Sequence, residues 1–227
     1  MKLLSILFLL TFTLLAETYI VHNSSIVENI KTVNTKPIKL IKKDFLLTKF
    51  SKLNLNLPAT FILNTHSDKN VVTLSIDEHF LDAIDIYIKN QRLYIASAKS
   101  IRTSLPIKII IDCKDGIEEI VMNSSVGLDV NNLNETNLKL SLKGINKTNF
   151  YNGKIDNLTI YAEGNYEVNL NEVKIKQAFI EAKGIGKIDL SVSTILNVNL
   201  AGLVKVYYLG QPIIEQSLKG LSKLERR

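Results

Sequence analysis

The stretch LKLSLKG at residues 138–144 recurs as LTIYAEG at 158–164, AFIEAKG at 178–184 and LNVNLAG at 196–202. In each copy the residues six, four and two positions before the glycine are apolar. Apolar residues at every second position bury one face of a β-strand. Because a single strand cannot bury that face alone, the four copies predict short strands stacked on one another. A fifth glycine, Gly220, continues the series at the same spacing that separates Gly184 from Gly202.

The outward positions of the same copies test whether such a stack is in register. Residues one repeat apart would then be lateral neighbours, and like charges would repel each other. Two series alternate in charge and two carry amide or acidic side chains, which predicts ion pairs and hydrogen bonds along the stack. The series are Lys143, Glu163, Lys183; Lys147, Glu167, Lys187; Asn137, Asn157, Gln177; and Asn149, Asn169, Asp189.

The predicted fold class is all-β: a parallel β-helix, or β-solenoid, whose coils in the C-terminal half have roughly 18–20 residues each. The N-terminal half is less regular. FSKLNLNLPATFILNT at 50–65 predicts two strands broken at Pro58, and VVTLSI at 71–76 predicts another. Turn-forming residues in IKNQR at 88–92 predict a tight reversal. The chain from 44 to 227 contains no stretch typical of a linker, so we expect a single domain there.

The N-terminal stretch MKLLSILFLLTFTLLAE combines one lysine, an apolar run at 3–15 and the small residue Ala16. This pattern predicts a secretory signal peptide at 1–16, with an uncleaved anchor as the alternative. The run is short for a membrane span, and no other stretch is long and apolar enough, so no transmembrane helix is expected in the mature chain. We expect a protein exported to the periplasm, to the outer surface or to the medium, with residues 17–43 as a basic linker.

The net charge of +6 and the lysine-rich segment 31–43 favour anionic partners. Lipid headgroups, lipopolysaccharide and nucleic acid all fit that description. Nucleic acid is the weakest candidate, because exported proteins seldom meet it and the segment contains no aromatic residue for base stacking. The expected partners are therefore an anionic glycan or an envelope protein, and no nucleic acid.

No motif for catalysis, cofactor binding or metal binding emerges, and none is predicted. Gly184-x-Gly186 precedes another strand-like run, whereas a phosphate loop needs a following helix. The three histidines, His22, His66 and His79, lack partners at metal-ligand spacing. Cys113, the sole cysteine, lies in an apolar run and is expected to be a buried thiol that fills core space.

Acidic side chains are the residues that an enzyme acting on envelope polysaccharide would need. Glu163 and Glu167 fall between lysines of the predicted stack, and the other pairs lie near turns or strand starts, so we expect solvated or paired carboxylates. Those pairs are Asp77–Glu78, Asp82–Asp85 and Glu118–Glu119. Three tyrosines, Tyr161, Tyr207 and Tyr208, are candidate contact residues on the outer surface, although they could equally cover the core.

These stretches resemble the putative auto-transporter adhesin, head GIN domain family. The similarity spans roughly 44–225, with its opening at 50–65, its next element at 71–97 and its ending at 200–225, which includes Gly202, the Gly210–Pro212 turn and Gly220. It implies an exported bacterial domain of uncharacterised biochemical function with a right-handed β-helical fold. The family usually has a second glycine two residues after the first. In this chain only Gly186 is such a second glycine. The equivalent positions of the other repeats are Asn146, Tyr166, Val204 and Ser222.

The sequence and the resemblance together predict a non-enzymatic, exported domain of the envelope or cell surface that binds or adheres through its exterior faces. Two alternatives stay open: an enzyme acting on envelope polysaccharide, and a purely structural component of the envelope.

Overall fold

The structure is a computed structural model that describes residues 39–103 and 105–227. The predicted signal peptide, His22 and most of the basic segment 17–43 lie outside these residues. Lys39–Arg227 forms one compact unit. Its first strand begins at Leu40 and so includes residues 40–43 of the predicted basic segment.

The described residues form thirteen strands and one short 3-10 helix, η2. Within them no helix has the length and hydropathy needed to cross a membrane. The elements are β1 (Leu40–Leu46), β2 (Lys52–Asn56), β3 (Ala59–Asn64), β4 (Val71–Asp77), η2 (Glu78–Ala83), β5 (Ile84–Lys89), β6 (Arg92–Ser97), β7 (Lys108–Asp112), β8 (Glu119–Met122), β9 (Val126–Asn131), β10 (Asn134–Tyr151), β11 (Gly153–Leu209), β12 (Ile213–Gly220) and β13 (Lys223–Arg226).

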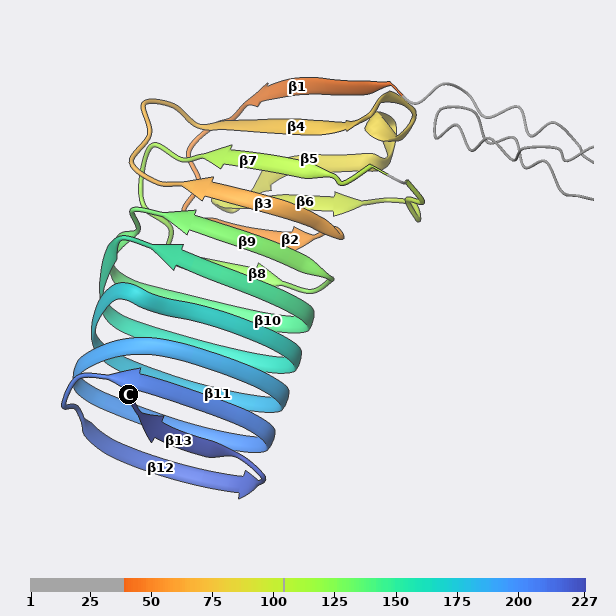
Figure 1. Ribbon diagram of the computed structural model, residues 1–227. Helices are drawn as coiled ribbons and strands as arrows, with labels where there is room; N and C mark the ends of the chain where they lie inside the picture. Colours follow the sequence, from red (N-terminus) through yellow and green to blue (C-terminus); the bar gives the residue numbers. More distant parts are fainter. Residues whose placement is uncertain (1–38, 104) are drawn as a thin grey trace, which may run out of the picture. The chain divides into compact units, whose positions relative to one another are not determined.

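All strands belong to one sheet that curls back on itself (Figure 1). The curl is visible in β10, which pairs with β8 through residues 139–142 and with β9 through residues 146–151. We call the part that continues through β8, β2, β6 and β5 face A, and the part that continues through β9, β3, β7, β4 and β1 face B. The long strand β11 contributes to both faces, β12 extends face A, and β13 extends face B.

The prediction of a right-handed parallel β-helix, or β-solenoid, is wrong. The sheet is mixed, because β1 pairs with β4, β4 with β7, and β5 with β6 in antiparallel directions. The residues at 88–92 explain one of these pairs: Asn90 and Gln91 both adopt positive φ, the geometry of a two-residue hairpin turn, so β5 and β6 pair as direct neighbours. The molecule is therefore all-β with a curled, half-barrel sheet of mixed direction.

The in-register pairing predicted from the outward series is confirmed. β10 and β11 run parallel and are offset by one repeat, which places Lys143 opposite Glu163 and Gly144 opposite Gly164. β11 and β12 are also offset by one repeat, with Gly202 opposite Gly220. All twelve apolar positions identified before the glycines are buried, on the inner side of face A.

The repeated glycines lie where the chain passes from face A to face B. Gly202 has φ 103°, a conformation that costs an L-residue about 1–2 kcal/mol. A Cβ at this position would also lie 2.5 Å from the carbonyl oxygen of Gly184 on the adjacent turn of chain. Glycine is thus required here both by the backbone conformation and by the close approach of the neighbouring backbone.

Gly186 has a different role, because it makes room for a side chain. A Cβ there would lie 2.5 Å from Cδ2 of Tyr166 and closer still to two other ring atoms. The Tyr166 ring is buried, and it occupies the space that a side chain at 186 would need. Since β11 continues through this segment, Gly184-x-Gly186 is a turn and a packing site within a strand.

Candidate binding site

A shallow groove of about 420 Å³ lies on the outer surface of face A, over β8, β10 and β11. It is formed where outward side chains from successive turns of chain stand beside one another. The lining residues are Val121, Asn123, Ser141, Leu142, Lys143, Tyr161, Ala162, Glu163, Glu181 and Lys183.

Tyr161 is the aromatic residue of this groove, and 40% of its surface is exposed. Phe179 on the next turn of chain, itself 38% exposed, meets it edge to face with ring centroids 6.1 Å apart. The Lys139 Nζ lies 5.5 Å from the Tyr161 centroid, within cation–π range. Neighbouring exposed aromatic rings beside a groove are typical of contact surfaces, which makes this cluster the leading candidate.

Charged side chains flank the aromatic pair. Lys143 Nζ lies 4.0 Å from Glu163 Oε2, as the alternating series predicted, and Lys183 Nζ lies 3.0 Å from Glu181 Oε1. The groove therefore offers ammonium donors and carboxylate acceptors beside the Tyr161 ring. All four side chains stay solvent accessible.

The other predicted series are confirmed where the structure records their contacts. Lys147 pairs with Glu167 at 3.2 Å, and the Asn157 amide donates to Asn137 at 3.0 Å. Lys187 departs from expectation, because it pairs with Asp189, its neighbour along the strand. The Asn149 amide donates to Asp129 on β9, its in-register neighbour one repeat earlier, which extends the fourth series. Charges thus find partners along a strand as well as between strands.

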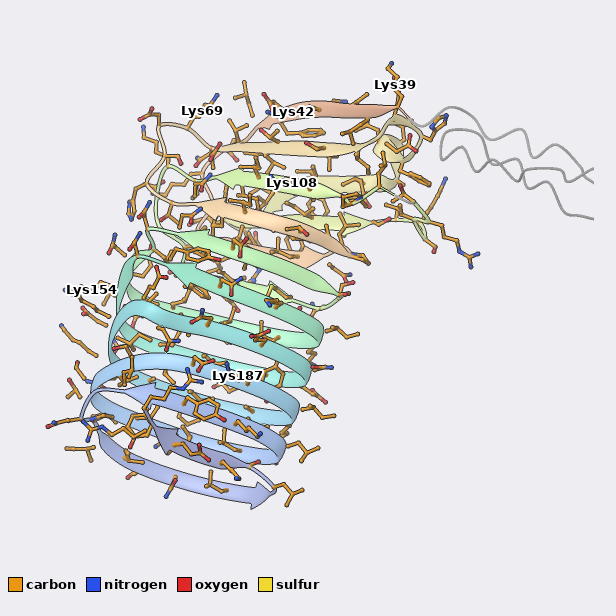
Figure 2. All side chains as sticks on the ribbon, viewed as in Figure 1. Lys39, Lys42, Lys69, Lys108, Lys154 and Lys187 are labelled. Carbon is orange, nitrogen blue, oxygen red and sulfur yellow. The ribbon has the colours of Figure 1, made fainter. Side chains whose placement is uncertain are left out.

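Tyr207 and Tyr208 lie away from the groove. Tyr207 belongs to face B, where the Arg227 guanidinium sits 4.3 Å from its ring centroid. Arg227 and Lys187 each form an ion pair with the buried Asp189 carboxylate at 2.7 Å, so Tyr207 belongs to a structural cluster. Figure 2 shows Lys187 on this face, together with Lys108 of β7. Tyr208 packs against the core. The structure therefore separates Tyr161 from the other two candidates.

His79 and two of the three acidic pairs, Asp77–Glu78 and Glu118–Glu119, have structural partners. Asp77 caps η2: its carboxylate accepts from the His79 backbone N–H at 3.2 Å and faces the ring Nδ1 at 2.8 Å. The hydrogen bond from the His79 ring lowers the pKa of Asp77. Glu118 pairs with Lys52 at 3.2 Å, and Glu119 with Arg92 at 2.6 Å.

Metal ligation finds no support in the described part of the chain. Residues 39–103 and 105–227 contain no group of three or more His, Cys, Asp or Glu side chains placed to hold a metal ion.

Cys113 is confirmed as a buried core thiol. Burial raises its pKa to about 11. Because the thiolate is the nucleophile, a thiol with such a pKa is poorly reactive near neutral pH. This cysteine therefore contributes packing to the core.

Sequence reasoning missed Phe179, the partner of Tyr161. It stands five residues before Gly184, an outward position of the repeat that the sequence analysis did not use. In a parallel stack offset by one repeat, that position is diagonal to Tyr161 on the preceding turn. The sequence signal for the contact was therefore an aromatic residue, Phe179, at an outward position diagonal to Tyr161.

Known proteins share this fold. A putative adhesin from Bacteroides fragilis aligns with 83% of this chain and 97% of its own, with 17% identity and a TM-score of 0.69. A putative adhesin from Parabacteroides merdae and a putative lipid binding protein from Parabacteroides distasonis each align with 83% of this chain and 96% of theirs, with 15% identity and a TM-score of 0.51. No curated protein matches the chain. The sequence matches the model of one family over residues 49–212, well over half its length, and so the chain belongs to the family of the putative auto-transporter adhesin, head GIN domain.

Proposed function

We propose that this protein is an exported, non-enzymatic adhesion domain that binds a glycan in the face A groove through Tyr161. The observation that carries the proposal is the exposed Tyr161 ring, which lines the groove together with two lysine–glutamate pairs and contacts Phe179. Family membership supports a surface or adhesion role in general terms. The choice of ligand rests on the chemistry of the groove.

Sugars present two kinds of surface, and the groove offers a counterpart to each. An exposed aromatic face buries the apolar C–H surface of a pyranose ring and gains free energy at low entropic cost. Lys143, Glu163, Glu181 and Lys183 supply donors and acceptors for hydroxyl groups around the ring. A rim of this kind sets the orientation of a ligand while the aromatic residue supplies most of the affinity.

Charge favours a glycan with acidic groups. Lys139, Lys143 and Lys183 lie around Tyr161, each within 4.0 Å of a glutamate carboxylate, and the chain as a whole carries a net charge of +6. Long-range attraction to such a surface speeds the encounter with an anionic polymer, and salt weakens that attraction. We therefore expect binding that depends on Tyr161 and declines as ionic strength rises.

The carboxylates of the groove favour binding over hydrolysis. A glycoside hydrolase needs two carboxyl groups placed on either side of the scissile bond, one of them able to donate a proton. Glu163 and Glu181 each lie in an ion pair with a lysine, an arrangement that supports a role in shaping the groove.

A glycan array tests this function. Wild-type protein, Tyr161→Ala and Tyr87→Ala are labelled and applied to the same array of neutral and acidic glycans. Tyr87 is the matched control, because it is also an exposed tyrosine in an aromatic pair, stacked on Tyr94 with centroids 4.9 Å apart, but outside the groove. We expect acidic glycans to bind wild type and Tyr87→Ala, and to lose binding to Tyr161→Ala. Equal binding by all three proteins, or no binding by any, contradicts the proposal.

A further inference from the structure

The two ends of the curled sheet differ in how they cover the core. At the end formed by β1 and β5, Phe80 and Leu81 of η2 pack against the core. At the other end, β12 is exposed along its whole length. Among the residues that the structure describes, β12 hydrogen-bonds with β11 alone, and its second edge is open (Figure 1).

Large apolar side chains crowd this open end. Ile213 and Leu221 are more than 70% exposed, and Ile214 and Leu218 of β12 are also exposed although their positions correspond to core positions on earlier turns of chain. An unpaired edge with exposed apolar side chains is a strong template for pairing with another strand. The question is which strand fits it.

The charges of β12 identify a partner. Around Ser217 the strand is self-complementary: Glu215 lies two residues before it and Lys219 two residues after. If two copies of β12 pair antiparallel with Ser217 opposite Ser217, Glu215 of each copy faces Lys219 of the other. Directly opposite residues point to the same side of a sheet, so both pairs form on the outer surface.

Face B repeats the pattern in β13. Lys223 and Glu225 stand on either side of Leu224. Antiparallel pairing of two β13 strands centred on Leu224 places each Lys223 opposite the Glu225 of the other copy. It also brings the two partly buried Leu224 side chains together on the core side.

The two pairings must share one rotation axis. Ser217 on face A and Leu224 on face B lie on either side of the turn at 221–222 that joins β12 to β13. A single two-fold axis through both residues produces the β12 and β13 pairings together. Interfaces with two-fold symmetry require this kind of self-complementary surface.

We propose that two copies of this chain associate end to end through β12 and β13, with a two-fold axis through Ser217 and Leu224. The dimer joins the two sheets edge to edge and covers the apolar side chains of both ends. It points the two face A grooves outward on one elongated particle, so that two weak sites can engage the same polymer.

Charge reversal and its compensation test the pairing. The mass of wild type, Lys219→Glu and the double variant Glu215→Lys/Lys219→Glu is measured by sedimentation at about 1–100 μM. We expect a dimer for wild type and a monomer for Lys219→Glu, because the substitution places Glu opposite Glu twice. The double variant restores opposite charges and should return to a dimer. Circular dichroism of each variant shows whether it is folded.

A cysteine at the axis gives an independent readout. Ser217→Cys should form a disulfide-linked dimer on mild oxidation, since equivalent residues opposite one another in antiparallel strands bring their Cβ atoms within about 4.5–5.5 Å. Asn199→Cys is the control, because Asn199 is exposed on the same outward series one turn away. Cys113 is buried and should not react.

Three results would overturn the proposal. Wild-type protein that is monomeric throughout this range has no such interface. A dimer that survives Lys219→Glu uses another surface. Equal cross-linking by Ser217→Cys and Asn199→Cys reflects random collision or a different contact, including one made by a segment outside the described residues.

Discussion

Replacing Gly186 by alanine should destabilise the protein through a single neighbour, the ring of Tyr166. The new Cβ would lie 2.5 Å or less from three ring atoms, whereas carbon atoms in ordinary contact are about 3.5–4.0 Å apart. The buried ring must therefore move by at least about 1 Å into a packed core. Overpacking of this kind costs about 1–3 kcal/mol.

The substitution is informative because Gly186, unlike Gly184, does not have a positive φ. Alanine therefore adds no backbone strain, and it lowers the entropy of the unfolded chain by about 0.4–1 kcal/mol in favour of folding. The net loss should be about 1–2 kcal/mol in the free energy of unfolding. Steric overlap is the sole unfavourable contribution that we expect.

A double-mutant cycle separates this overlap from any general effect. Tyr166→Val removes the ring, and valine suits the series, because Val204 is fully buried at an equivalent position. In the Tyr166→Val background Gly186→Ala should be neutral or slightly stabilising, since the methyl group then fills space. The cycle should give a coupling energy of at least about 1 kcal/mol.

Urea denaturation followed by circular dichroism or tyrosine fluorescence measures all four proteins, and the chain contains no tryptophan to interfere. If Gly186→Ala costs the same in both backgrounds, the two residues do not compete for space. The explanation of Gly186 given above would then be refuted.

Three further predictions concern other parts of the fold. Gly202→Ala should lower the free energy of unfolding by at least about 2 kcal/mol, because Gly202 combines positive φ with close approach of the neighbouring backbone. Gly127→Ala is the control: a Cβ there meets only ordinary contacts, so urea denaturation should show a loss of less than about 1 kcal/mol. Burial raises the pKa of Glu135, so its contribution to stability is present below the unfolded-state pKa and is lost as pH rises through the folded-state pKa. Wild type should therefore lose stability relative to Glu135→Gln between pH 4 and 7, as urea titrations at both pH values would measure. Cys113 should resist alkylation by iodoacetamide at pH 7.5 in native protein and react at once in about 8 M urea, as mass spectrometry would show.

The stacking of the second half of the sheet was predictable because its signal is local and repeated. Leu138, Leu158 and Leu196 hold one inward position in three copies, and each is buried as expected. The pairing of Lys143 with Glu163 followed from the same spacing. A repeat of fixed length fixes the register, and the register fixes which outward side chains meet.

The antiparallel pairings of β1 with β4 and of β4 with β7 could not be predicted, because they depend on contacts between segments far apart in the chain. β1 lies at 40–46, within or beside the lysine-rich segment that looked like a linker, yet it pairs with β4. Its lysines are exposed, while Phe45 packs against the core. Composition alone does not distinguish an edge strand of this kind from a solvated linker.

The candidate groove was predictable in part. Tyr161 was identified as an outward aromatic residue, but so were Tyr207 and Tyr208, and nothing in the sequence ranks the three. The difference comes from distant partners. Arg227, near the end of the described chain, packs over the Tyr207 ring, whereas Tyr161 borders an open groove.

Calorimetric titration measures the affinity of the groove for an acidic glycan. The glycan that binds best on the array is titrated into wild type, Tyr161→Ala and Tyr87→Ala at low and high salt. We predict that Tyr161→Ala weakens the Kd by at least about 10-fold, or about 1.4 kcal/mol, while Tyr87→Ala changes it less than about 2-fold. Equal affinities for wild type and Tyr161→Ala would contradict the account, because the groove would then not be the binding site.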